Sequence, residues 1–274
     1  MSRHDAGRVP ATCRWTAVVL LTVLPAVPGA APAAAPVLCG ATLVDDFTLE
    51  EDLTCAGTAL IVGADGIKIH LQGHTITGNG TGAGLLVTGR TGIRILGGTV
   101  VNFMAGVQVS SSTEIEIKNA TFRANTDGID VQAGATGVSI KENKFLDNRA
   151  RGIMNRSGTS GNEIKANAFM GNRVGILLFG PVGITVKDNY ITSSVQFGMR
   201  VNFPATGNLI KDNTITSNPS GIDFIPSPTG TGAVGNDFVA NRILSNACGL
   251  SGPMGGNTFL DNQLIGNTVD VCGP

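Results

Sequence analysis

The stretch IKENKFLDNRARGI, residues 140–153, contains every element of a pattern that repeats along most of the chain. Its glycine, which is followed by an apolar residue, belongs to a series that returns at intervals of 22, 22, 24, 23, 23, 23 and 28 residues. The members of the series are Gly84, Gly106, Gly128, Gly152, Gly175, Gly198, Gly221 and Gly249. Periods of this length are typical of repeat architectures, and they decide the fold before any other feature does.

Two columns of apolar residues keep the same register. The first column contains Leu71, Ile95, Ile117, Ile140, Ile164, Val186, Ile210, Phe238 and Phe259. The second column follows five residues later, at Ile76, Val100, Phe122, Phe145, Phe169, Ile191, Ile215, Ile243 and Leu264. Because the offset between the columns never varies, we expect both to face one continuous core.

Two columns of asparagine are locked to the same pattern. One stands two residues before the second apolar column, at Asn143, Asn167, Asn189, Asn213, Asn241 and Asn262. The other stands three residues after it, at Asn79, Asn125, Asn148, Asn172, Ser194, Asn218, Asn246 and Asn267. An asparagine that returns at each bend can bond the amide of the next one when the bends stack at strand spacing. We therefore predict asparagine ladders at the bends.

Between the bends, apolar and polar residues alternate over three to five positions, as at 107–109 and 115–117. Alternation of this kind is the period of a strand, and the runs are too short for helices. A leucine-rich repeat would need a leucine consensus, and a propeller blade would need a longer period. The sequence therefore predicts an all-β fold, a single-stranded right-handed parallel β-helix (a solenoid) of about nine coils.

The first residues predict export. Arg3, Arg8 and Arg14 precede an apolar run over residues 15–23, and small residues follow over 25–35, which is the organisation of a signal peptide. The run is shorter than the roughly 20 residues of a membrane span, so we expect no membrane span in the mature protein. We predict a signal peptide over residues 1–35, an N-terminal cap over 36–66 and the β-helix over 67–274.

Four cysteines follow the predicted signal peptide: Cys39, Cys55, Cys248 and Cys272. An even number in an exported protein indicates two disulfides, and the positions near opposite ends favour Cys39–Cys55 and Cys248–Cys272 over crossed pairings. No metal site is predicted, because no CxxC motif or histidine cluster accompanies them. We expect a secreted, periplasmic or cell-surface location.

The repeat resembles that of the bacterial right-handed parallel β-helix repeat proteins, which belong to the pectate-lyase-like superfamily. The resemblance is carried by the Gly-Ile strand starts, the Asn-x-Phe and Asn-x-Ile bends, and LQGHTITG at residues 71–78, which is similar to a first-coil signature of that family. It covers nearly the whole mature chain but includes no active-site motif. Because the family includes polysaccharide lyases, hydrolases, epimerases and non-catalytic members, the resemblance implies a fold and no single activity.

One column of outward positions supplies the candidate catalytic residues. The column runs through Gln108, Asp130, Met154, Leu177, Arg200 and Asp223, and Asp127, Arg151 and Arg173 lie in the adjoining turns. Elimination from a uronate needs a cation to neutralise the carboxylate and a base to remove a proton. We therefore predict Arg200, Asp223 and Asp130 as catalytic residues, with Asp223 as the partner of Arg200. Arg151 and Arg173 are predicted to bind substrate.

A hydrolase and a simple surface ion pair are the alternatives to this interpretation. Asp130 and Asp223 stand four coils apart, about 19 Å at strand spacing, which exceeds the roughly 5–9.5 Å between the carboxyl groups of a glycosidase. A hydrolase pair is therefore not predicted. The alternative for Arg200 and Asp223 is a surface ion pair with little effect on stability and no catalytic role.

Five lysines directly follow the first apolar column, at Lys118, Lys141, Lys165, Lys187 and Lys211. We predict Lys141, Lys165, Lys187 and Lys211 as further substrate-binding residues, because a stripe of ammonium groups attracts an acidic polymer. Four acidic residues lie beside the stripe, at Glu116, Glu142, Asp188 and Asp212. They favour the alternative of a solvated face whose charges compensate one another.

Charged residues make up 14% of the chain and the formal net charge is −1, which argues against a nucleic-acid partner. We expect an exported protein that binds or processes a polysaccharide, acidic if the basic residues contact it, with a lyase-like reaction as the enzymatic version. The alternative is a non-catalytic secreted or periplasmic scaffold that presents its coils to another protein. We expect a monomer, and the sequence identifies no cofactor.

Overall fold

The computed structural model describes residues 39–226 and 232–273. The predicted signal peptide, residues 1–35, lies outside the described residues. Within the described part of the chain there is no helix, and the strands pair in parallel in three sheets. The prediction of an all-β right-handed parallel β-helix is confirmed.

The first sheet has 11 strands and supplies the face on which the candidate site lies. Its strands are β1 (Ala41–Leu43), β4 (Leu60–Val62), β7 (Ala83–Thr88), β10 (Ala105–Ser110), β13 (Asp127–Val131), β16 (Arg151–Arg156), β19 (Val174–Phe179), β22 (Phe197–Asn202), β25 (Ser220–Ile225), β28 (Cys248–Ser251) and β31 (Val269–Cys272).

The second and third sheets have ten strands each. The strands of the second sheet are β2 (Phe47–Thr48), β5 (Lys68–His70), β8 (Arg94–Leu96), β11 (Glu116–Lys118), β14 (Ser139–Lys141), β17 (Glu163–Lys165), β20 (Thr185–Lys187), β23 (Leu209–Lys211), β26 (Asp237–Val239) and β29 (Thr258–Leu260). The strands of the third sheet are β3 (Leu53–Thr54), β6 (Thr75–Thr77), β9 (Thr99–Val101), β12 (Thr121–Arg123), β15 (Lys144–Leu146), β18 (Ala168–Met170), β21 (Tyr190–Thr192), β24 (Thr214–Thr216), β27 (Arg242–Leu244) and β30 (Gln263–Ile265).

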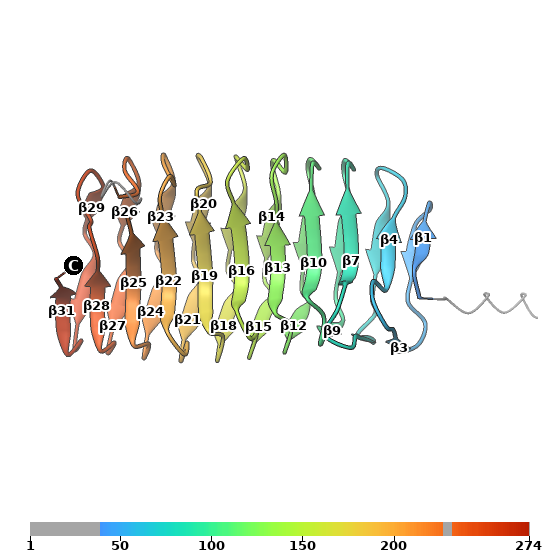
Figure 1. Cartoon of the computed structure of the whole chain (residues 1–274), viewed down its shortest axis with the longest axis horizontal. Coiled ribbons are helices and arrows are strands. Elements are labelled where there is room, and N and C mark those ends of the chain that lie inside the picture. Colours follow the sequence, from blue (N-terminus) through green and yellow to red (C-terminus); the bar gives the residue numbers. More distant parts are fainter. Residues whose placement is uncertain (1–38, 227–231, 274) are drawn as a thin grey trace, which may run out of the picture. The chain divides into compact units, whose positions relative to one another are not determined.

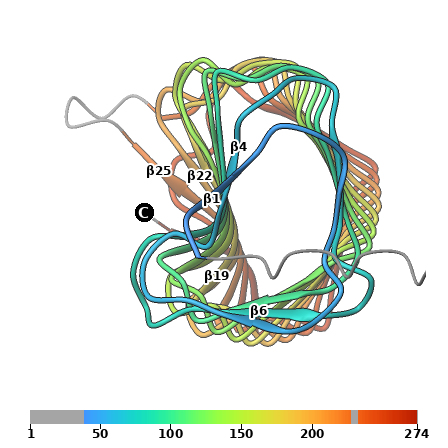
Figure 2. The ribbon, with the colours of Figure 1, turned by 90° about the vertical axis from the view of Figure 1, so that its right-hand side faces the viewer.

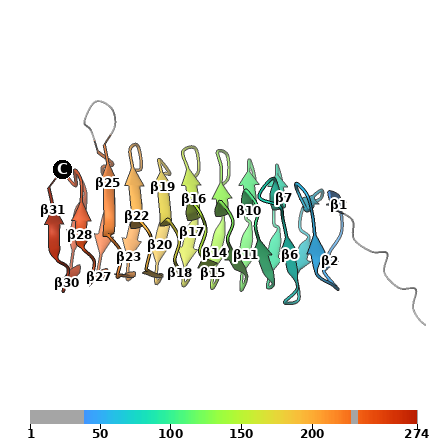
Figure 3. The same ribbon diagram turned by 60° about the horizontal axis from the view of Figure 1, so that its bottom comes forward.

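Successive strands along the chain belong to successive sheets, so each coil contributes one strand to every sheet (Figures 1 and 3). Viewed along the stack, the coils superimpose around a common centre (Figure 2). The described residues form ten complete coils, close to the nine predicted. The additional coil arises because residues 41–54, which lack the glycine and asparagine columns, already form β1, β2 and β3.

The two apolar columns line the interior as predicted. Ile117 pairs with Ile140 in the second sheet, and Phe122 pairs with Phe145 in the third. All four side chains are fully buried. Phe145 also stacks on Phe169, and its ring centroid lies 5.3 Å from that of Phe122 and 4.7 Å from that of Phe169. Identical side chains therefore lie above one another in successive coils.

The glycine column is required by close packing. A Cβ atom at Gly128 would lie 2.5 Å from the carbonyl oxygen of Gly152 and 2.6 Å from the ring of Phe145. Gly152 meets the same obstacles in the next coil, from Gly175 and Phe169. Glycine therefore allows the backbone of the first sheet to approach the phenylalanine column, which explains why the two patterns share a register.

The asparagine ladders are also present. Asn167 donates its side-chain amide to Oδ1 of Asn189 at 3.0 Å, and Asn189 donates in turn to Asn213 at 2.9 Å. The same amides donate to carbonyl oxygens of the preceding coil. The structure contains a third ladder that was not predicted, in which Asn208 donates to Asn236 and Asn236 to Asn257.

Replacing Asn189 by alanine is expected to lower the free energy of unfolding by about 2 kcal/mol. The side chain makes four hydrogen bonds, with the backbone and side chain of Asn167, with Ile164 and with Asn213, and its loss leaves buried polar groups unpaired. Urea denaturation of the variant measures the effect. Gln108→Ala, on the outward face of β10, is the control, and an equal loss in both variants would contradict the ladder's role.

Both predicted disulfides are present, between Cys39 and Cys55 and between Cys248 and Cys272. Disulfides of this kind are typical of proteins that fold in an oxidising compartment. In the described residues, no helix combines the length and the hydropathy that crossing a bilayer would demand.

Candidate functional site

The predicted outward column forms one continuous row on the first sheet. Asp130 pairs with Met154, Met154 with Leu177, and Leu177 with Arg200 in adjacent strands. Arg200 pairs with Asp223, which completes the row over β13 to β25. A second outward row lies beside it and contains Asp127, Arg151, Val174, Phe197 and Ser220.

Arg200 and Asp223 form an ion pair between β22 and β25. Nε of Arg200 donates to Oδ2 of Asp223 at 2.8 Å, and the hydroxyl of Ser251 donates to the other carboxylate oxygen at 2.6 Å. The guanidinium also lies 3.7 Å above the ring of Phe197, a distance at which a cation is attracted by an aromatic face. Asp223 therefore fixes the orientation of Arg200.

A second group of charges lies on β13 and β16. Arg151 binds both carboxylate oxygens of Asp127, at 2.6 and 3.0 Å, and Arg156 binds both oxygens of Asp130, at 2.7 and 3.0 Å. Asp130 also accepts a hydrogen bond from Gln132. Burial raises the pKa of the Asp127 carboxyl above its usual value, while the hydrogen bond from Arg151 lowers it. The roles of Arg156 and Gln132 were not anticipated from the sequence.

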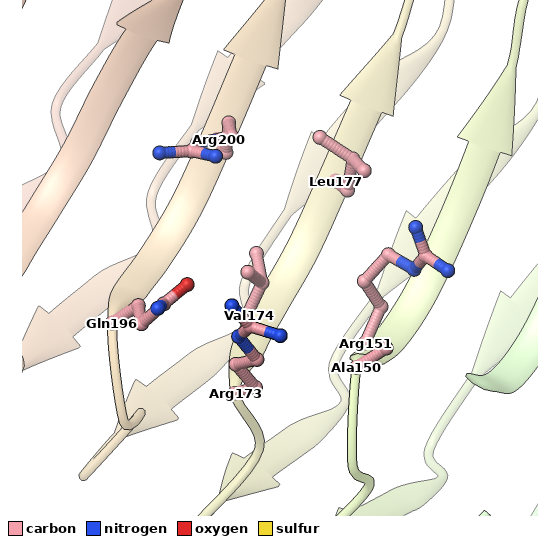
Figure 4. Close-up of a pocket in the computed structure, with 7 residues that line it drawn as sticks. All are labelled: Ala150, Arg151, Arg173, Val174, Leu177, Gln196 and Arg200. Carbon is pink, nitrogen blue, oxygen red and sulfur yellow. The ribbon is translucent and has the colours of Figure 1, made fainter. Parts of the chain in front are cut away.

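Between these two groups lies a small apolar cluster. Met154, Val174 and Leu177 are buried although they point outward, and Phe197 packs against them. A depression of about 160 Å³ opens over this cluster, lined by Ala150, Arg151, Arg173, Val174, Leu177, Gln196 and Arg200 (Figure 4). The structure thus brings together three of the predicted site residues, the arginines at 151, 173 and 200.

The depression can bind an anion. Arg151 and Arg200 have aspartate partners, whereas Arg173 is exposed and has no ion pair within residues 39–226 and 232–273. A guanidinium donates up to five hydrogen bonds in a planar fork that matches a carboxylate. As far as the described residues go, the lining contains no carboxylate or imidazole. Its side chains therefore supply cations but no group that can act as a base at pH 7.

The remaining candidate catalytic residues lie outside the depression. Asp130 is held on β13 by Arg156, and Asp223 reaches the depression only through Arg200. Four strand spacings separate the two aspartates in the register, about 19 Å. Among the residues that the structure describes, no three His, Cys, Asp or Glu side chains gather in a way that could hold a metal ion.

The lysine column lies on a different face, the second sheet, in continuous register from Lys118 to Lys211. Lys141 pairs with Glu116 at 2.5 Å and Lys187 with Glu163 at 2.8 Å. The hydrogen bond from Lys141 holds the pKa of the Glu116 carboxyl below its usual value. Carboxylates pair with four of the five lysines, Lys118, Lys141, Lys187 and Lys211. Since the column lies on the second sheet, the structure does not bring its lysines together with the arginines of the first sheet.

The central part of the chain, residues 105–269, matches the family described as the right handed beta helix region. No curated protein sequence matches the chain significantly. Several solved structures are similar at low sequence identity, and such likeness concerns the fold alone.

One of these structures is the periplasmic alginate epimerase AlgG, with a TM-score of 0.61 and 17% identity over 74% of this chain and 60% of the epimerase. Another is the alginate lyase from Paenibacillus sp. str. FPU-7, with a TM-score of 0.60 and 13% identity over 81% of this chain and 97% of the lyase. The tailspike protein of E. coli bacteriophage HK620, solved in complex with a pentasaccharide, has a TM-score of 0.60 and 10% identity over 86% of this chain and 53% of the tailspike. The chain thus spans about three fifths of the epimerase.

Proposed function

This chain belongs to the right-handed β-helix family, and on that premise we propose that it is an exported protein that binds an acidic polysaccharide on its first sheet. Similar solved structures include a polysaccharide epimerase, a polysaccharide lyase and a tailspike bound to a pentasaccharide, which supports a carbohydrate as the ligand. The two disulfides and the signal-peptide pattern support export.

The observation that carries the proposal is the depression between Arg151, Arg173 and Arg200. Its floor contains Val174 and Leu177, which suit the C–H face of a sugar ring, and its walls contain guanidinium groups, which suit a carboxylate. We assign binding of the carboxylate to Arg173 and Arg200, with Asp223 as the positioning residue of Arg200. Asp130 is assigned to the support of Arg156.

Binding is favoured over elimination because of the composition of the lining. Elimination from a uronate needs a base close to the proton that leaves. Arginine remains protonated in proteins, and the side chains that line the depression in the described structure include no other candidate base. A lyase-like reaction would have to use Arg200 against this preference, so we treat it as an outcome of the test.

Replacing Arg173 or Arg200 by alanine is expected to weaken binding of alginate or pectate by about tenfold or more, because each loses a charge-assisted hydrogen bond. Calorimetric titration of the purified protein measures the effect, with neutral dextran as the ligand control. Lys165→Ala is the matched variant, since it removes one half-buried positive charge on the second sheet, whereas the depression lies on the first.

Equal loss in the Lys165 and Arg173 variants would contradict the location of the site. Absence of binding to every acidic polymer would contradict the function and favour the scaffold alternative. If unsaturated products are detected by their absorbance and Arg200→Ala abolishes them, the function is a lyase reaction and not binding alone.

A further inference from the structure

The strand β19 differs from its neighbours in the first sheet because its outward side chains are all apolar. Val174, Leu177 and Phe179 point outward along it, and none carries a charge. The adjacent strands β16 and β22 present arginines, at 151, 156 and 200. The outward side chains of Val174, Leu177 and Phe179 therefore form an uncharged track along β19, between two strands that bear guanidinium groups.

The counter-ions of these arginines lie one strand farther from β19. Arg151 pairs with Asp127 on β13, and Arg200 pairs with Asp223 on β25. An acidic chain that ran along the axis of the β-helix would leave the track and meet the carboxylates of β13 or β25. An acidic chain that followed β19 would meet arginines on both sides and no carboxylate among these pairs. The charge pattern favours the direction along the strand.

The far end of the track carries two exposed aromatic side chains. Phe179 closes β19 and is 44% exposed, and Phe203, which follows the end of β22, is 41% exposed. They lie at the same edge of the sheet, because Phe179 pairs with Asn202 in the register. Exposed phenylalanines on adjacent coils offer flat apolar surfaces, of the kind on which the C–H face of a sugar ring packs.

The distance between the two features suits an oligosaccharide. Phe179 lies five residues beyond Val174, which lies at the far end of the depression, and this separation corresponds to about 17 Å at the rise of a strand. This span is the length of a trisaccharide or tetrasaccharide. Asn202 lies beside the track, and its buried Oδ1 has no hydrogen-bond donor among the described residues, so rotation of the amide toward a sugar hydroxyl would satisfy it.

We propose that an acidic oligosaccharide crosses the β-helix along β19, with an acidic sugar in the arginine depression and a second ring packed on Phe179 and Phe203. This inference rests on the proposed function and adds to it a second subsite, an orientation and a ligand length. The arginine depression selects the carboxylate, and the phenylalanine edge selects a ligand long enough to reach it.

The test is calorimetric titration of the whole mature protein with mannuronate, dimannuronate, tetramannuronate and octamannuronate. Affinity is expected to rise from the monosaccharide to the tetrasaccharide and then to level off. Phe179→Ala and Phe203→Ala are expected to weaken tetrasaccharide binding about fivefold to tenfold and to leave monosaccharide binding unchanged. Tyr190→Ala is the matched control, since Tyr190 is an exposed aromatic residue on the third sheet.

Three outcomes would overturn the inference while the proposed function stands. They are unchanged tetrasaccharide affinity in both phenylalanine variants, an equal loss for the monosaccharide, and a continued steep rise up to the octasaccharide, which would indicate a ligand along the axis. Failure of every oligomer to bind the unmodified protein would overturn the proposed function and this inference with it. Far-ultraviolet circular dichroism of the variants verifies that they retain the fold.

Discussion

Replacement of Phe145 by alanine is expected to lower the free energy of unfolding by about 3–5 kcal/mol. The side chain is fully buried and stacks between Phe122 and Phe169. Its removal eliminates the transfer free energy of a large apolar group and leaves a cavity. The stacked backbone limits the collapse of that cavity, since the register of β15 with β12 and β18 fixes the spacing of the coils.

Guanidinium chloride denaturation followed by circular dichroism measures the loss. Met170→Ala is the control, because Met170 lies on the same strand, β18, that carries Phe169, but its side chain points outward and is exposed. We expect that variant to change the free energy of unfolding by less than about 0.5 kcal/mol. A loss below 1 kcal/mol in Phe145→Ala would show that the core rearranges freely and that the phenylalanine stack does not determine stability.

Replacement of Arg151 by alanine is expected to destabilise the protein by about 3–5 kcal/mol at pH 7, because it leaves the buried Asp127 carboxylate without its bidentate partner. The loss should shrink as the pH falls toward 4. Burial already raises the pKa of Asp127 in the folded protein, and removal of the arginine removes an interaction that lowers it.

The sign of the pH dependence follows from proton linkage. A carboxyl whose pKa is higher in the folded state binds more protons there than in the unfolded chain, so stability falls as the pH rises through the interval between the two values. Below the unfolded value, about 3.9 for an aspartate, the carboxyl is protonated in both states and needs no counter-ion. The deficit of the Arg151 variant is therefore greatest at neutral pH.

Denaturation midpoints at pH 4 and pH 7 test this expectation. The double variant Asp127→Asn with Arg151→Ala serves as the control, because an amide cannot ionise and its deficit should be small and independent of pH. Equal deficits of the single variant at both pH values would mean that the lost packing of the Arg151 side chain, and not the unpaired charge, causes the destabilisation.

The sequence predicts the fold well because the same physical demand returns in each coil. Ile140, Asn143 and Phe145 each occupy a position whose neighbours above and below are of the same kind, so a one-dimensional pattern contains the contacts. The glycine column is predictable for the same reason, since its glycines from Gly106 to Gly221 each meet a phenylalanine or isoleucine of the second apolar column. The two disulfides follow from the even number of cysteines after the predicted signal peptide and from their positions near opposite ends of the chain.

The candidate site is less predictable because it depends on departures from the repeat. The register correctly places Arg200 beside Asp223, but the bidentate partners Asp127 with Arg151 and Asp130 with Arg156 depend on side-chain length and burial. The exposed edge at Phe179 was not predicted either, because this residue belongs to none of the repeating columns. Its outward position becomes visible only when the count along β19 is continued from Leu177 by two residues.

Within residues 39–226 and 232–273, each strand pairs only with the equivalent strands of the coil before it and the coil after it, and this nearest-neighbour pairing makes the chain modular. Excision of residues 94–115, one full period, would bring together coils that share the same register and would keep β13 to β25. Length can therefore change by whole units without redesign of the interior. The strands that carry the arginines and the apolar track would be displaced along the axis as one cassette, with their mutual geometry intact.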